Sequence, residues 1–304
     1  MADLKIFRIR EGVATELPSH AVALERALQH LIERNMEEMF ATRFLASEFS
    51  TGNRHGGRID SLGIDENNSP VIFEYKRATN ENVINQGLFY LNWLLDHKAE
   101  FTLLVMEKLG RDAADSIDWR APRLVCVANG FTRYDEHAVE QINRSIDLVT
   151  YRDFGGELFA LELVHTARVE PQSASDAPGV SRGTGHSKTV SELLNQASPE
   201  LAALYEQLDA FLTALGDDVS KKATKQYFAY RRLKNFACVE VHPQSRNLLV
   251  YIKVNPDAVE LEEGFSRDVR KIGHFGTGDL ELRIASQRDL ERAEALLSLS
   301  YENS

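Results

Sequence analysis

GRIDSLGIDENNSPVIFEYKRATNENVINQGLFY, residues 57–90, is the stretch that decides the fold of the N-terminal half. Its VIFEYK segment, residues 71–76, is rich in β-branched and aromatic residues and predicts a short strand. Residues 58–64 predict a partner strand, and the polar DENNSP segment between the two favours a turn. The resulting hairpin is expected to bring Asp60 beside Glu74.

Asp60, Glu74 and Lys76 form a charged group on this predicted hairpin. Successive side chains of a strand point to opposite faces, so Glu74 and Lys76 share one face. Two converging carboxylates repel each other unless a cation lies between them, and carboxylate oxygens are ligands that Mg²⁺ or Mn²⁺ prefers. The sequence therefore predicts a divalent metal site with a lysine beside it, and Mg²⁺ or Mn²⁺ is the expected cofactor.

A helix is predicted directly after the hairpin, because apolar residues recur at helical spacing in ENVINQGLFYLNWLL, residues 81–95, with Thr79 or Asn80 as a candidate cap. Residues four apart lie on one face of a helix, so Gln86 and Tyr90 project together. Their amide and phenol groups can hydrogen-bond a phosphate or a base without adding charge. Each short pattern alone is more typical of a solvated surface, and the order of the patterns along the chain favours a site.

The order Asp60, then Glu74-x-Lys76, then Gln86-x-x-x-Tyr90 resembles the PD-(D/E)XK nuclease superfamily, in particular its DUF91-like and RecB-like branches. The resemblance covers roughly residues 1–165. It implies a restriction-endonuclease-like α/β fold, with a mixed central sheet flanked by helices, and metal-dependent hydrolysis of phosphodiester bonds.

In that superfamily the motif Asp and Glu bind the metal and the motif Lys assists catalysis. The resemblance therefore assigns metal binding and catalysis to Asp60 and Glu74, and a catalytic role to Lys76, with Gln86 and Tyr90 as further catalytic-site residues. Ile59 stands where the family label has proline, at a position that varies widely in the family.

A further acid from the first helix usually completes the site in this superfamily. The predicted first helix, residues 19–40, offers four glutamates, which are Glu25, Glu33, Glu37 and Glu38. Glu25 lies nearest the helix start and is assigned by resemblance to the catalytic and metal-binding residues. Glu48, in a segment that could form an adjacent strand, remains an alternative.

Two domains and a linker are predicted from composition. Residues 168–187 are rich in Pro, Gly and Ser, so we expect a nuclease-like domain at 1–167, a flexible linker at 168–187 and a smaller α+β domain at 188–304. In the first domain, further strands are predicted at 101–106, 123–128, 146–151 and 158–164, and a helix at 135–145. In the second, helices are predicted at 190–196, 199–215, part of 219–233 and from Ser286, and strands at CVEVHPQSRNLLVYIKV and DLELRI.

The second domain resembles the DUF5655 group through YFAYRRLKNFACVEVHP and GHFGTGDLELRI, and this group supplies no chemistry. Between Val219 and Val239 there is no acid, whereas cations alternate with aromatic residues. Lys221, Lys225 and Arg232 are therefore candidate nucleic-acid-binding residues. The alternative is the solvated face of an amphipathic helix.

A net charge of −11 argues against a broadly basic nucleic-acid-binding surface, so such contacts must be local. Cys126 and Cys238 are predicted to be buried thiols, and the expected location is the cytoplasm, because no signal peptide or membrane-length apolar segment is evident. Expected partners are nucleic acid, DNA more than RNA, and no membrane; a homodimer is compatible with the sequence. The favoured function is Mg²⁺-dependent cleavage of DNA in defence or repair, and the alternative is a non-catalytic nucleic-acid-binding or scaffold protein that retains the fold.

Overall fold

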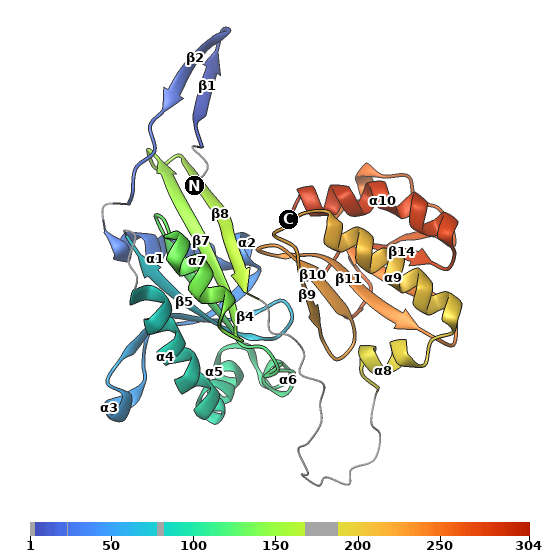
Figure 1. Ribbon diagram of the computed structural model, residues 1–304, viewed down its shortest axis with the longest axis horizontal. Coiled ribbons are helices and arrows are strands. Elements are labelled where there is room, and N and C mark those ends of the chain that lie inside the picture. The colour runs from blue at the N-terminus through green and yellow to red at the C-terminus, as the bar shows by residue number, and fades with distance from the viewer. Residues whose placement is uncertain (1–3, 23, 78–81, 168–187) are drawn as a thin grey trace. The chain divides into compact units, whose positions relative to one another are not determined.

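The computed structural model describes residues 4–22, 24–77, 82–167 and 188–304, which form two compact units (Figure 1). The units are Met1–Val169 and Glu170–Ser304, and their described residues end at Ala167 and resume at Lys188. The predicted linker, residues 168–187, lies outside the described residues. Each unit has its own hydrophobic core and is described by itself.

A six-stranded mixed sheet organises the first unit, with strand order β3-β4-β5-β6-β7-β8. The strands are β3 (Thr42–Ser50), β4 (Arg58–Asp65), β5 (Pro70–Lys76), β6 (Arg123–Ala128), β7 (Ser145–Phe154) and β8 (Leu158–Ala167). Strands β5, β6 and β7 are parallel, whereas the other neighbours are antiparallel. The predicted hairpin is therefore β4–β5, and the strands predicted from residue 123 onward are present as β6, β7 and β8.

Helices cover this sheet (Figure 1). The described helices of this unit are α1 (Glu25–Arg34), α2 (Met36–Phe40), α4 (Asn82–Asp96), α5 (Lys98–Leu109), α6 (Arg111–Asp115) and α7 (Arg133–Glu140), together with α3 (Gly52–His55) in the connection between β3 and β4. Successive residues of β5 face opposite sides of the sheet. Ile72 packs in one core with Leu91 of α4, whereas the ring of Phe73 lies 5.1 Å from the ring of Phe40 in α2. The predicted fold class, a central mixed sheet flanked by helices, is confirmed.

Gly87 sets how closely α4 approaches the sheet. A Cβ atom at this position would lie 2.5 Å from a methyl carbon of Leu124 on β6, so only glycine permits the observed packing distance. The close approach fixes the height of the neighbouring helix residues Gln86 and Tyr90 above the sheet.

Three sequence predictions for the first unit are wrong in whole or in part. Residues 101–106 were expected to form a strand, but they belong to α5. Short buried apolar runs occur in both strands and helices, so the pattern does not distinguish the two. The helix expected at 19–40 begins only at Glu25 and is interrupted at Asn35, whose φ is −123°. The helix expected at 135–145 is α7, and β7 already starts at Ser145.

A two-stranded sheet, β1 (Ile6–Arg10) and β2 (Val13–Leu17), was not predicted. Its turn consists of Glu11 and Gly12, with φ of 50° and 78°, the backbone that a two-residue hairpin turn requires.

An antiparallel sheet of order β13-β14-β12-β11-β10-β9 forms the second unit together with three α-helices. Its strands are β9 (Ser220–Ala223), β10 (Phe228–Arg231), β11 (Asn235–His242), β12 (Asn247–Ile252), β13 (Ser266–Asp268) and β14 (Leu280–Ile284), and its helices are α8 (Val190–Asn195), α9 (Pro199–Ala214), α10 (Gln287–Glu302) and the short 3₁₀ turn η1 (Pro256–Ala258). This is the predicted α+β architecture. The helix expected within 219–233 is wrong, since that segment forms the strand pair β9–β10.

Cys126 and Cys238 are both buried and free of disulfides, as predicted. Within the described ranges, no helix combines the length and the apolar character needed to cross a membrane.

Candidate active site

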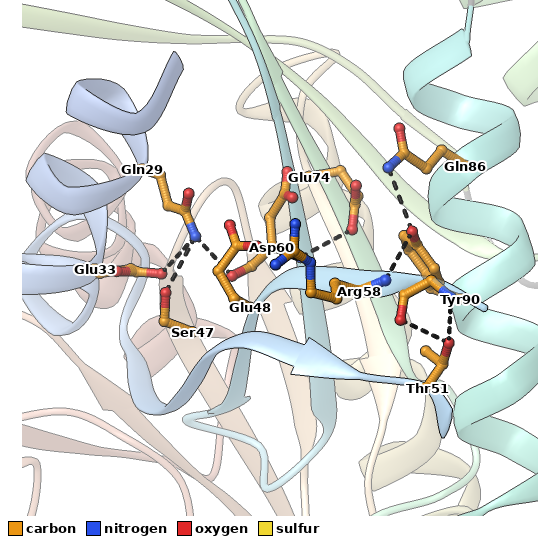
Figure 2. Close-up of polar contacts among 11 residues, drawn as sticks. Gln29, Glu33, Ser47, Glu48, Thr51, Arg58, Asp60, Glu74, Gln86 and Tyr90 are labelled. Carbon is orange, nitrogen blue, oxygen red and sulfur yellow. Dashed lines mark hydrogen bonds and ion pairs between the residues drawn. The ribbon is translucent and has the colours of Figure 1, made fainter. Parts of the chain in front are cut away.

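The β4–β5 hairpin places Asp60 directly across from Glu74, because Ser61 pairs with Phe73 one position further along (Figure 2). Each of the two carboxylates also accepts a hydrogen bond from a backbone amide of the opposite strand. The Asp60 amide donates to Oε1 of Glu74 at 3.3 Å, and the Tyr75 amide donates to Oδ2 of Asp60 at 3.0 Å. The strand pairing therefore fixes both carboxylates, as the sequence predicts.

Both carboxyl groups titrate at unusually high pH. Burial, followed by the charge of Asp60, raises the pKa of Glu74 from 4.5 to about 9. Burial likewise raises the pKa of Asp60 from 3.8 to about 6, against the opposing effects of the Tyr75 amide and of Lys76. Oε2 of Glu74 is buried and has no hydrogen-bond partner among the described residues. Two desolvated acids with an unmatched oxygen favour a positively charged ligand between them.

Lys76 and Glu25 form an ion pair at the end of β5. The Lys76 ammonium lies 3.1 Å from Oε1 of Glu25, the first residue of α1, and the Arg77 amide donates to Oε2 of Glu25. Burial of Lys76 opposes its charge, but Glu25, Asp60 and Glu74 outweigh this effect and raise the lysine pKa above 10.5. Lys76 is thus held as a cation beside the acids.

Glu48 lies across from Asp60 on the other side of the hairpin. It falls between the pairs Ser47–Ser61 and Phe49–Ile59 of β3 and β4, and its φ of 51° is left-handed. Its carboxylate accepts an ion-pair contact of 3.3 Å from Arg58 (Figure 2). The charges of Glu25 and Glu48 each raise the pKa of Asp60, so both candidate acids lie near it and both remain open.

Gln29, Glu33, Ser47 and Ser61 form a polar network beside Asp60, and Figure 2 shows its first three members. The Gln29 amide donates to the Asp60 carbonyl at 2.8 Å and to Glu33 at 3.1 Å, and Ser61 donates to Glu33 at 2.6 Å. Glu33 therefore braces β4 from α1 rather than facing Asp60 as a ligand. Gln29 and Ser61 carry no motif, and the signal for them in the sequence is their spacing: Gln29 lies four residues before Glu33 on a helix, and Ser61 follows Asp60 on a strand.

Glu37 and Glu38 lie in the first turn of α2, and both are exposed. The glutamate charges that raise the pKa of Asp60 are those of Glu48 and Glu25, so these two acids are the better placed candidates.

Gln86 and Tyr90 project together from α4, with 3.4 Å between the amide nitrogen and the phenol oxygen (Figure 2). Tyr90 is buried, and its hydroxyl accepts a hydrogen bond of 3.2 Å from the Arg58 amide at the start of β4. A Cβ atom on Gly57 would lie 2.7 Å from the Tyr90 ring. The structure thus gives Tyr90 a bracing contact to β4, while Gln86 is half-buried beside it.

Two of the three predicted nucleic-acid-binding cations are engaged within the second unit. Lys221 lies 2.6 Å from Asp209 and about 5–6 Å from three ring centroids, those of Tyr205, Phe228 and Tyr230. Arg232 lies 2.6 Å from Asp218, and its guanidinium lies over the Tyr301 ring. Lys225 is exposed in the β9–β10 connection. The three cations therefore do not share a helix face.

Comparison with known proteins finds an uncharacterized protein of Haemophilus influenzae that is 28% identical over 314 residues, covering 99% of this chain and 100% of that protein. Among solved structures, a repair endonuclease from Pyrococcus abyssi is 18% identical with a TM-score of 0.29, covering 43% of this chain and 49% of that one. A complex of EndoMS with double-stranded DNA is 21% identical with a TM-score of 0.25, covering 43% and 47%. The chain thus spans about half the length of each of these solved chains. Residues 190–304 match the family described as a domain of unknown function, DUF5655, as the sequence predicts.

Proposed function

We propose that this protein is a Mg²⁺- or Mn²⁺-dependent nuclease that hydrolyses phosphodiester bonds of DNA. The observation that carries the proposal is the Asp60–Glu74 pair, a half-buried and a buried carboxylate on adjacent strands, whose pKa values are raised to about 6 for Asp60 and about 9 for Glu74. Such a pair is unfavourable for folding without a cation, and acids perturbed by burial and by each other are typical of functional sites.

The donor set suits a hard divalent cation. Mg²⁺ in phosphate-processing sites is commonly held by one or two carboxylates, with water and substrate oxygens completing the octahedron. Asp60 and Glu74 would hold the ion, with Glu25 or Glu48 as a third acid. Among the described residues, no three His, Cys, Asp or Glu side chains already form a metal-binding cluster. When bound, the ion would supply Lewis-acid polarisation of the phosphodiester.

The neighbouring residues would then have separate tasks. Lys76, held as a cation by Glu25, would orient the attacking water or offset negative charge that develops on phosphorus. Gln86 would donate its amide to a phosphate or base. Tyr90 would keep Arg58 and the start of β4 in place through its hydroxyl.

The test is incubation of the full chain with labelled single-stranded, double-stranded and branched DNA and with RNA, in Mg²⁺, Mn²⁺ or EDTA. We expect metal-dependent cleavage of DNA, and we expect Asp60→Asn, Glu74→Gln and Lys76→Ala each to reduce it by at least about 10²-fold without additive effects.

Asp112→Asn, which removes an exposed acid in α6, is the matched control and should cleave at the wild-type rate. Cleavage that persists in EDTA, or an Asp60→Asn variant with wild-type activity, would refute the metal-dependent mechanism. Metal binding without cleavage of any of these nucleic acids would instead support a non-catalytic protein.

A further inference from the structure

A chain of aromatic rings runs from the core to the surface beside the candidate site. It consists of Phe49, Trp93, His97, His55 and Phe89, which we call the aromatic ridge. Consecutive ring centroids along it are 5.7, 4.6, 5.5 and 5.7 Å apart. None of these residues has a role in the chemistry proposed above.

The ridge ends at an exposed ring. Trp93 is only 1% exposed, whereas Phe89 is 48% exposed. Single exposed apolar residues are ordinary on protein surfaces. Phe89 differs because two neighbours hold its ring, His55 from α3 and Tyr90 from its own helix, each with its centroid 5.7 Å away. These two contacts restrict the positions open to the ring, which reduces the entropy cost of binding a flat ligand.

Short contacts join Phe89 to the acidic pair. Its neighbour Tyr90 accepts a hydrogen bond from the Arg58 amide, and Arg58 lies two residues before Asp60 on β4. Two strand residues span about 6.6 Å and place both side chains on one face. The Arg58 side chain is 69% exposed and forms an ion pair of 3.3 Å with the half-exposed Glu48. Tyr90 therefore contacts both the accessible Phe89 ring and the backbone of Arg58, whose guanidinium is accessible.

We propose that Phe89 is a stacking site for one unpaired nucleobase of the strand bound at Asp60 and Glu74, and that Arg58 contacts an adjacent phosphate in place of Glu48. This inference rests on the proposed function and specifies its substrate. Bases inside a duplex are already stacked on each other, whereas an unpaired base can stack on a protein ring. The ligand chemistry is thus single-stranded DNA or a locally opened duplex. A protein partner is disfavoured because the ring adjoins a cation and a phosphodiester site.

Binding can be measured without cleavage. Fluorescence anisotropy of the full chain in EDTA, with a labelled single strand and with the matching duplex, compares wild type with Phe89→Ala and Phe89→Trp. Loss of one stacked base corresponds to roughly tenfold weaker binding, so Phe89→Ala should weaken single-strand binding about 5–10-fold, and Phe89→Trp should retain it. Duplex binding should change by less than about twofold. Leu103→Ala, which removes a 61% exposed residue on α5, is the matched control and should have no effect.

An abasic scan identifies the contact. The base is removed from one nucleotide at a time. At a single position, the loss of binding affinity caused by the missing base should not add to the loss caused by Phe89→Ala, because both changes remove the same stacking contact. Unaltered single-strand affinity of Phe89→Ala, an equal loss for the duplex, or additivity at every position would each overturn the inference. These outcomes are separable from failure of the proposed function. If the protein cleaves DNA and Phe89→Ala binds single strands as wild type does, only the stacking site is refuted. If the protein cleaves no nucleic acid but shows the abasic pattern, only the nuclease chemistry is refuted.

Discussion

Replacing Glu74 by Gln should stabilise the metal-free protein at neutral pH. In the fold, burial and Asp60 raise the pKa of Glu74 to about 9, whereas in the unfolded chain the value is the ordinary 4.5. Between these two values the fold keeps the carboxyl protonated and the unfolded chain ionises it, so folding takes up a proton and stability falls as pH rises. Glutamine has no proton to take up and can still accept the Asp60 amide hydrogen bond.

The magnitude follows from the pH interval. The interval from pH 4.5 to pH 7 is about 2.5 pH units. At about 1.36 kcal/mol per unit, the free energy of unfolding of the wild type falls by about 3 kcal/mol over this interval, whereas that of the variant does not. For a unit of this size the corresponding gain in Tm is about 6–12 °C. The gain should vanish near pH 4.5 and should shrink in saturating Mg²⁺, because the ion stabilises only the wild-type fold.

The assay is urea or thermal unfolding of wild type and Glu74→Gln in EDTA over this pH range, repeated with Mg²⁺. Glu33→Gln is the matched control, because Glu33 accepts hydrogen bonds from Ser61 and Gln29, and its replacement should destabilise the protein at every pH. A Glu74→Gln variant no more stable than wild type at pH 7 in EDTA, or a gain independent of pH, would refute the reasoning.

Further predictions concern contacts away from the acids. Lys221→Gln should cost about 1 kcal/mol in unfolding of the second unit while DNA affinity stays unchanged, because its ammonium is held by Asp209 and three rings; Lys225→Gln, which changes an exposed side chain, is the control for the unfolding measurement. Gly57→Ala should destabilise the first unit by about 1–3 kcal/mol in thermal unfolding, because the new methyl group would displace the Tyr90 ring. Arg123→Met should cost about 3–5 kcal/mol in urea unfolding, because it leaves buried carboxylates without their cation. Wild-type stability in any of these variants would contradict the corresponding contact.

The hairpin and its acids were predictable because they depend on local rules. A strand period of two and a polar turn are enough to set Glu74 across from Asp60. The same rules place Gln86 and Tyr90 on one helix face. These features are encoded within about 30 residues, so no long-range information is needed.

The remaining features depend on packing that a local pattern does not contain. The segment from Phe101 is equally apolar as strand or helix, and only its layer in the core decides that it is α5. The spacing of Lys221 and Lys225 suggested one face of a helix. The segment instead forms strands, because Phe228 and Tyr230 lie on the same face of β10 and pack in one core with residues of α9. The bracing role of Tyr90 depends on Gly57, which is separated from it by a whole hairpin.

The left-handed backbone at Glu48 has a consequence for how this protein can change. A non-glycine residue in that conformation costs about 1–2 kcal/mol, and the half-exposed ion pair of Glu48 with Arg58 offsets little of this cost. Glycine at this position would relieve the strain and make the protein more stable. Selection for stability alone would therefore favour replacement of Glu48 by glycine, which removes this carboxylate from beside Asp60. We expect that replacement in lineages in which the acid has no function. A glycine at the equivalent position of a related chain would indicate a site that uses Glu25 as its further acid. A retained acid there would indicate a site that uses the carboxylate despite the backbone strain.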